Sequence, residues 1–436
     1  MEDPLRGRDF RLLVAASALS SLGDELALIA LTIKVANLTD SGWAVAALLL
    51  AGLLPLVIFA PAAGVIVDNY ETTRTLSVAS GFQAIAALAL AFVSGLPAIL
   101  LLAFLLGTAT AVATPALYTL VPAVVGDEHA TAANAYLETA RYGGMIAGPL
   151  LAGLFSAIPR VGSEVALLVD CATFVVIAAS AFALTVRRRP MGALEEGSKG
   201  EAKAGFGVIG RDGLLVVTFT VFGAVILFAA MDNVAEVFFA TDTLNAGGWG
   251  YGLLASAWIV GLVLGASMIA RKLPNARLVP ALLVASVVLG LAVGVSAAIA
   301  VLIPAIVLFV VGGAANGVQS VSMRSLIVHR VEDRYRGRVF AAYGGLANGM
   351  QLLATGLAGG LVVLTSGRTA LIVGGTGCVV AGLIGLAWYR LLPADVRAMP
   401  EPAAHDAVAM GFPDGDAVML LPESEHAVAA TSDSHR

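Results

Sequence analysis

The chain has 436 residues, of which 59% are hydrophobic and 13% are charged, and its formal net charge is −5. A soluble domain of this size could not bury so much apolar surface, so the composition favours a membrane protein over a soluble one. The two cysteines, Cys171 and Cys378, both lie in apolar stretches, which argues against a disulfide framework.

Twelve apolar stretches follow one another along the chain, and each is long enough to cross about 30 Å of hydrocarbon as a helix. The predicted spans are residues 12–36, 43–67, 76–95, 97–120, 131–158, 164–186, 213–240, 249–270, 278–297, 300–322, 339–365 and 368–391. The sequence therefore predicts an all-α membrane protein with twelve transmembrane helices, surrounded by the lipid bilayer.

The chain repeats itself with an offset of about two hundred residues. Ser41–Trp43 opens one apolar stretch, and Gly247–Trp249 opens another 206 positions later. Duplicated halves are how many secondary transporters build a substrate path. The predicted parts are an N-terminal six-helix bundle at residues 1–186, a linker at 187–212, a C-terminal six-helix bundle at 213–392 and a tail at 393–436.

Lys and Arg are distributed unequally between the two sides of these spans. If both termini are cytoplasmic, twenty of the 25 basic residues are cytoplasmic, and only Lys34, Arg160 and Arg368 are outside. The positive-inside rule therefore predicts cytoplasmic termini and a cytoplasmic linker. The tail is rich in Ala, Pro and acidic residues, so we expect it to be disordered.

The loop between the second and third spans carries Gly64, Asp68 and Arg74. The spacing of Gly64 and Asp68 resembles the Gly-x-x-x-Asp signature of the major facilitator superfamily. The resemblance implies that Asp68, together with Gly64 and Arg74, acts as a latch between conformations. Asp68 can accept hydrogen bonds from the first N–H groups of the third span or pair with a cation across the bundle. An ordinary loop carboxylate is the alternative to the latch.

The fifth span carries Gly144, Gly148, Pro149 and Gly153. This pattern resembles the Gly-Pro antiporter motif of drug–proton exporters in the same superfamily. The glycines leave a smooth helix face that permits close helix approach, so generic packing and a gating role both explain them.

Three further segments resemble the branch that holds macrolide-efflux and siderophore-exporter proteins: Leu120–Pro122, Asn134–Ala135 and Arg336–Phe340. The chain departs from such exporters in one respect, because residues 97–120 contain no charge where the exporters commonly place an Arg. The resemblance implies the major facilitator fold and proton-coupled export by alternating access.

Asp24 and Glu25 lie at the centre of the first span. A carboxylate at the bilayer midplane costs about 2.5–3.5 kcal/mol, so it normally has a partner or a function. Successive residues point about 100° apart on a helix, so we expect one of them to line a cavity and the other to pack against a neighbour. Because a buried carboxylate can load and release a proton, these two are candidates for proton coupling. A structural hydrogen-bonded pair is the alternative.

Asp232 and Glu236 lie four apart on one face of the seventh span, which is the counterpart of the first, and Asn233 adds polarity there. They are candidates to face the substrate cavity, where they would bind a cationic substrate or assist coupling. A position at the outer mouth, in water, is the alternative. The other polar candidates for the cavity are Asn316, Gln319, Asn348 and Gln351.

Glu138 and Arg141 lie three apart in the fifth span and are expected to form an ion pair. Asp170 in the sixth span has no obvious partner in the sequence. Neither a Walker loop nor a cluster of Cys and His with metal-ligand spacing is present, so we expect no enzymatic activity, cofactor or metal.

These features predict a secondary active transporter in the bacterial cytoplasmic (inner) membrane. We expect a monomer that exports amphipathic small molecules, drug-like or siderophore-like, in exchange for protons, and that has no nucleic-acid partner. An uptake carrier and a lysophospholipid flippase of the same fold are alternatives. A membrane receptor or scaffold that transports nothing is another.

Overall fold

The computed structural model describes residues 7–126, 129–156, 162–186 and 205–398. All regular secondary structure within these ranges is helical. Most of the predicted linker and nearly all of the predicted tail lie outside the described residues, so the expected disorder of the tail is not tested.

The helices of the N-terminal half correspond to the first six predicted spans. The second span is broken at Phe59 into two helices, close to Pro55. The helices are α1 (Arg8–Thr39), α2 (Gly42–Ile58), α3 (Ala60–Asn69), α4 (Thr72–Phe92), α5 (Leu96–Val125), α6 (Ala130–Ser156) and α7 (Gly162–Ala183).

The C-terminal half has the same order of spans. Its first span is broken near Ala230 into α9 and α10, and α10 and α11 each continue as a short π-helix. The helices are α9 (Gly213–Ala229), α10 (Asp232–Phe238), α11 (Gly247–Leu264), α12 (Leu278–Ile299), α13 (Leu302–Arg330), α14 (Asp333–Leu364), α15 (Gly367–Leu391) and the short α16 (Ala394–Arg397).

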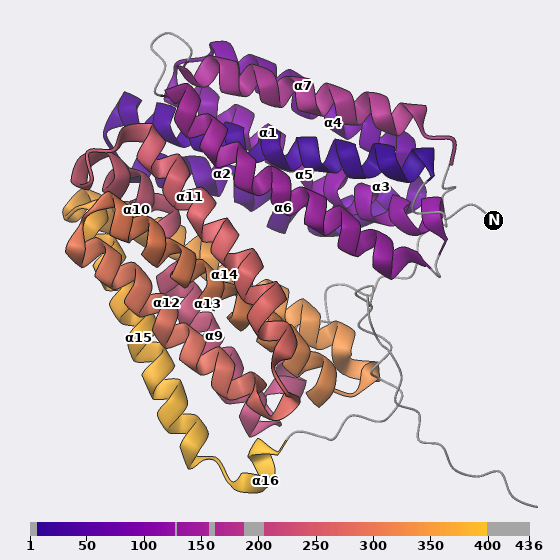
Figure 1. Ribbon diagram of the computed structural model, residues 1–436. Coiled ribbons are helices and arrows are strands. Elements are labelled where there is room, and N and C mark those ends of the chain that lie inside the picture. Colours follow the sequence, from indigo (N-terminus) through magenta and orange to yellow (C-terminus); the bar gives the residue numbers. More distant parts are fainter. Residues whose placement is uncertain (1–6, 127–128, 157–161, 187–204, 399–436) are drawn as a thin grey trace, which may run out of the picture.

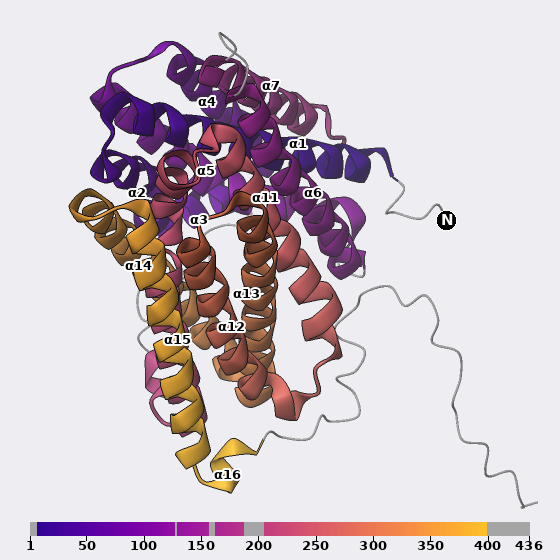
Figure 2. The same cartoon turned by 60° about the vertical axis from the view of Figure 1, so that its left-hand side comes forward.

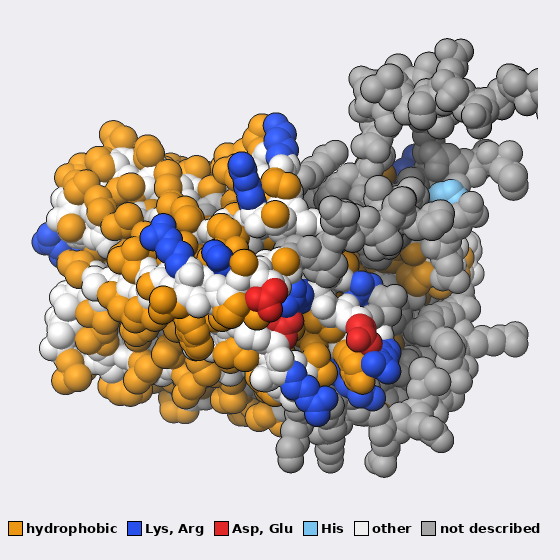
Figure 3. Space-filling model, turned by 90° about the horizontal axis from the view of Figure 1, so that it is seen from below, with side chains coloured by type: hydrophobic (Ala, Val, Ile, Leu, Met, Phe, Trp, Pro, Cys, Tyr) orange, Lys and Arg blue, Asp and Glu red, His pale blue; other side chains and the backbone are white. Residues whose placement is uncertain are grey.

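The surface of these bundles suits a bilayer. Among the described residues, ten helical segments are long and apolar enough to cross a membrane. Two further helices, the 17-residue α2 and α6 with its Glu138 and Arg141, complete the twelve predicted spans. Large apolar side chains such as Phe82 and Phe182 are 64% and 74% exposed, and hydrophobic side chains are spread widely over the described part of the face in Figure 3. The protein is therefore a multi-pass membrane protein.

The two halves meet at one end and diverge toward the other. In Figures 1 and 2, helices α1–α7 form the upper bundle and α9–α15 the lower one. The contacts between them are made by α6 with α11, by α2 with α14 and α10, and by α1 with α10 and α11. These contacts lie near the connections from α1 to α2 and from α10 to α11, and the bundles spread apart toward the end of α7 (Figure 1).

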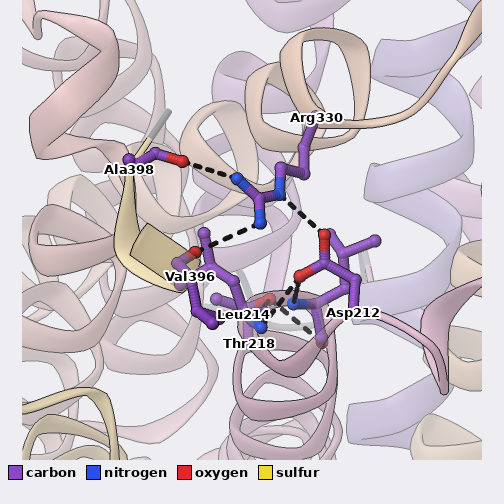
Figure 4. Close-up of polar contacts among 7 residues, drawn as sticks. Asp212, Leu214, Thr218, Arg330, Val396 and Ala398 are labelled. Atoms are coloured by element: carbon purple, nitrogen blue, oxygen red, sulfur yellow. Dashed lines mark hydrogen bonds and ion pairs between the residues drawn. The ribbon is translucent and has the colours of Figure 1, made fainter. Parts of the chain in front are cut away.

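A half-buried ion pair joins three elements at the opposite end of the C-terminal half (Figure 4). The Nε of Arg330, at the end of α13, donates to Oδ2 of Asp212 at 2.7 Å. Asp212 also caps α9, because its Oδ1 accepts from the backbone N–H groups of Leu214 and Leu215. The guanidinium of Arg330 donates to the carbonyl oxygen of Val396 at 3.1 Å as well, so α9, α13 and α16 are held together.

Candidate functional site

Helix α6 packs against α1 through two glycines of the predicted antiporter motif. A Cβ atom at Gly144 would lie 2.3 Å from the carbonyl oxygen of Ala18, and one at Gly148 would lie 2.7 Å from the Cβ of Glu25. Both distances are shorter than van der Waals contact, so any larger residue would force the helices apart. Gly144 and Gly148 therefore allow α6 to approach the segment of α1 that carries the central carboxylates.

The rest of the motif faces the other half of the molecule. A Cβ atom at Gly252 of α11 would lie 2.2 Å from the carbonyl oxygen of Pro149, and one at Gly153 would lie 3.0 Å from that of Gly248. The hydroxyl of Ser256 donates to the carbonyl oxygen of Ile146 at 3.0 Å. Helix α6 is thus in close contact both with α1 and with the C-terminal half.

Asp24 and Glu25 point into different surroundings. Asp24 lines a polar pocket of about 60 Å³ inside the N-terminal half, which has room for water molecules. Its carboxylate accepts a hydrogen bond from Ser20 at 3.3 Å. The side chain of Asp24 is solvent-exposed, so this pocket opens to the surface of the N-terminal half. Glu25 lies instead against Gly148 of α6.

The predicted pair of Glu138 and Arg141 is present, with Oε1 and Nη1 3.4 Å apart. Both side chains also hydrogen-bond to the hydroxyl of Tyr118 from α5, and Nε of Arg141 donates to Ser21 of α1 at 3.2 Å. Arg141 lines the polar pocket and acts electrostatically on Asp24. A guanidinium from the fifth span therefore neighbours the acids of the first, although the fourth span has no charge.

Carboxylates from both halves approach one buried tyrosine. Tyr251 of α11 is 6% exposed. Glu236 and Asp232 of α10 and Glu25 of α1 act on its hydroxyl electrostatically, and Thr32 of α1 is within hydrogen-bonding reach of it. We refer to Glu25, Thr32, Asp232, Glu236 and Tyr251 as the inter-half polar group.

Two carboxylates of this group lack polar partners. Glu236 is 8% exposed, and neither its Oε1 nor the Oδ1 of Asp232 has a hydrogen-bond partner among the described residues. Sequence reasoning singled out these two acids but missed Tyr251. No local signal marks this tyrosine, because its importance comes from the contact between α11 and α1.

The remaining polar candidates are not gathered at the inter-half polar group. Gln319 is buried within the C-terminal bundle, where its Nε2 donates to the hydroxyl of Ser286 at 2.8 Å. Asn233 and Asn348 are exposed, while Asn316 and Gln351 are half-buried. The inter-half polar group is therefore built mainly from carboxylates and hydroxyls rather than amides.

A sequence model described as the Major Facilitator Superfamily matches residues 13–303, well over half of the chain. The chain belongs to the major facilitator superfamily. It is accordingly a membrane transporter by family and by fold. A search of curated protein sequences finds no match.

Solved structures of other superfamily members share this fold at low sequence identity. The nucleoside transporter NupG is similar with a TM-score of 0.73 and 14% identity, over 88% of this chain and 100% of that one. A POT family transporter in complex with 5-aminolevulinic acid gives 0.71 and 13%, over 87% and 96%. A bacterial homologue of the iron transporter ferroportin, in an inward-facing state, gives 0.66 and 14%, over 87% and 98%.

The superfamily signature between the second and third spans is only partly described. No atom lies within 4 Å of the position that a Cβ would take at Gly64, and the side chain of Asp68 lies outside the described residues. Arg74 is 79% exposed and its Nε lies 3.6 Å from a carboxylate oxygen of Glu71. The latch role of Gly64, Asp68 and Arg74 stays a prediction.

Proposed function

We propose that this superfamily member exports amphipathic small molecules in exchange for protons, as a monomer in the bacterial cytoplasmic membrane. The observation that carries the proposal is the inter-half polar group, in which ionisable side chains of both halves act electrostatically on one buried tyrosine. Alternating access requires contacts between the halves to break and re-form. A change of charge at this contact would therefore change the balance between conformations.

The direction of this effect follows from the cost of burying charge. Ionised Asp232 and Glu236 would be like charges four residues apart, with unpartnered oxygens in a low-dielectric contact, which is costly. A protonated carboxyl carries no charge and can donate a hydrogen bond. Protonation would thus stabilise the contact seen here, and loss of the protons would favour its opening.

Export rather than uptake is supported by the pattern of Gly144, Gly148, Pro149 and Gly153. This pattern resembles the antiporter motif of drug–proton exporters, and it lies between α1 and α11. Substrate class is proposed from charge, since desolvated carboxylates favour cationic partners. The similar solved structures include a nucleoside transporter and a POT family transporter, so the fold alone does not select a substrate.

An accumulation experiment tests this proposal. Cells that overexpress the wild type should accumulate less of a lipophilic cation, and a protonophore should reverse the effect. Asp232→Asn should impair export of the cation more than export of a neutral analogue, because only the cation loses an ion pair. Asp242→Asn is the matched control, since Asp242 is an exposed carboxylate in the short π-helix that continues α10.

Two results would contradict the proposal. Increased accumulation of a polar nutrient, independent of Asp232, would favour the uptake carrier. Unchanged accumulation of cationic, neutral and lysolipid probes, with folded protein present in the membrane, would favour a receptor or scaffold.

A further inference from the structure

Asp170 of α7 is a buried carboxylate beside the central helix α1. It is 1% exposed, and its Oδ1 has no hydrogen-bond partner among the described residues. A Cβ atom at Gly23 of α1 would lie 2.7 Å from this Oδ1 and 2.4 Å from Oγ1 of Thr173. Gly23 therefore makes room for α7 to bring the carboxylate directly against α1.

The residue after Gly23 is Asp24, and Asp24 acts electrostatically on Asp170. Asp24 lines the polar pocket, whereas Asp170 is enclosed beside it. The pocket is also lined by Gln83, which donates to Thr110 at 3.0 Å. Asp170 therefore lies next to the turn of α1 that carries Asp24, and of the two carboxylates only Asp24 has access to the pocket.

Few cations offset the negative charge in this region. The ionisable groups on the helices around Asp170 are Asp24 and Glu25 on α1, Tyr136, Glu138, Arg141 and Tyr142 on α6, and Cys171 on α7, with Arg8, Asp9, Arg11, Lys34, Arg74 and Glu164 toward the helix ends. Arg141 is already bound to Glu138, Tyr118 and Ser21. Arg141 acts electrostatically on Asp24 and Glu25, whereas no cation among the described residues acts on the enclosed Asp170. An ionised Asp170 without a cationic partner is costly unless it holds or shares a proton.

We propose that Asp24 and Asp170 together hold one exchangeable proton inside the N-terminal half. Two adjacent carboxylates repel when both are ionised, and one shared proton removes the repulsion and supplies a hydrogen-bond donor to the pair. The proton would enter and leave through Asp24, the member that lines the pocket. Gly23 and the close packing of α1 on α7 place Asp170 against the turn of α1 that carries Asp24.

This site is separate from the inter-half polar group. Asp24 and Glu25 point about 100° apart on α1. Helix α1 therefore contributes Asp24 to the proposed proton site within its own half and Glu25 to the inter-half polar group. The role of the Asp24–Asp170 pair in coupling rests on the proposed function. The presence of the shared proton does not.

Infrared difference spectroscopy of the full-length protein in nanodiscs tests the proposal without any substrate. The wild type should retain a protonated-carboxyl band near neutral pH that is lost on further alkalinisation. This band should persist when Glu25→Gln, Asp232→Asn and Glu236→Gln remove the carboxyls of the inter-half polar group. Asp24→Asn and Asp170→Asn should each abolish this band, since the remaining carboxylate then faces a neutral amide that can donate to it. The double variant should look like either single one, because only one proton is shared.

Two controls separate this effect from misfolding. Glu164→Gln removes an exposed carboxyl from the outer turn of the same helix and should leave the band intact. If Asp170→Asn does not fold, Asp170→Glu keeps the carboxyl group and should displace the band without removing it.

Three results would overturn the proposal. The band could persist in Asp24→Asn, in which case Asp170 alone holds the proton. It could persist in Asp170→Asn, which leaves Asp170 with only a structural role. It could also disappear from the wild type on addition of sodium chloride at constant pH, which would make sodium the occupant.

If the band behaves as expected but substrate moves no protons, the shared-proton site stands and the exporter proposal falls.

Discussion

Asp24 and Glu25 are adjacent in the chain, but their side chains contact different groups. Asp24 lies in the polar pocket beside Arg141 and close to Asp170, whereas Glu25 packs on α6 and acts on Tyr251 of the other half. At the level of single residues, α1 therefore connects a polar interior within one half to the contact between the halves.

Glu25→Gln should abolish gradient-driven transport and leave folded protein in the membrane. The substitution keeps the shape of the side chain and removes only its ability to ionise, so a purely structural role predicts little change. Transport driven by an imposed pH gradient in proteoliposomes measures this. Full transport with an unaltered pH response in Glu25→Gln would eliminate this residue from coupling.

At the scale of helices, α1 and α6 are held together by contacts that only glycine permits. Gly144→Ala should destabilise the protein by about 1–3 kcal/mol, because the added methyl group would overlap the backbone of α1. Gly143→Ala is the matched control, since no atom lies within 4 Å of its Cβ position. Melting temperatures in detergent should therefore fall for Gly144→Ala alone. Equal melting temperatures would show that α1 and α6 are less tightly packed than described.

A second prediction concerns the elements joined by Arg330. Its side chain and that of Asp212 are 16% and 23% exposed, so removing one charged partner should cost about 1–3 kcal/mol. Arg334 forms a similar pair with Glu332, but these side chains are 70% and 67% exposed, and such pairs contribute below about 1 kcal/mol. Arg330→Ala should lower the melting temperature, and Arg334→Ala should not. Equal effects would contradict a structural role for the Asp212–Arg330 pair.

At the scale of the whole molecule, the Lys and Arg bias predicts which end of the bundles is cytoplasmic. Arg211 and Asp242 are both exposed and lie at opposite ends of the first span of the C-terminal half. In a background of Cys171→Ala and Cys378→Ala, an impermeant thiol reagent added to intact cells should label Asp242→Cys but not Arg211→Cys. The reverse pattern would invert the orientation, and the contact between the halves would then lie on the cytoplasmic side.

The sequence predicted the twelve spans and the two halves well, because a bilayer imposes a minimum length of apolar helix that is visible in one dimension. Helix ends were less well predicted, as α13 continues with polar residues to Arg330. The pair of Glu138 and Arg141 was predictable because both residues lie on one helix. The role of Tyr251 and the proximity of Asp24 to Asp170 could not be predicted from the sequence. These contacts join segments that are distant in the chain, so they depend on how the helices pack.

The central claim is that conformational exchange between the halves is linked to proton movement. Purified protein in proteoliposomes with an internal pH dye tests it most directly. Addition of a lipophilic cation to wild-type vesicles without an imposed gradient should move protons in the direction opposite to the cation, and Glu25→Gln should transport neither. Movement of substrate by the wild type with no accompanying change of pH would contradict the account.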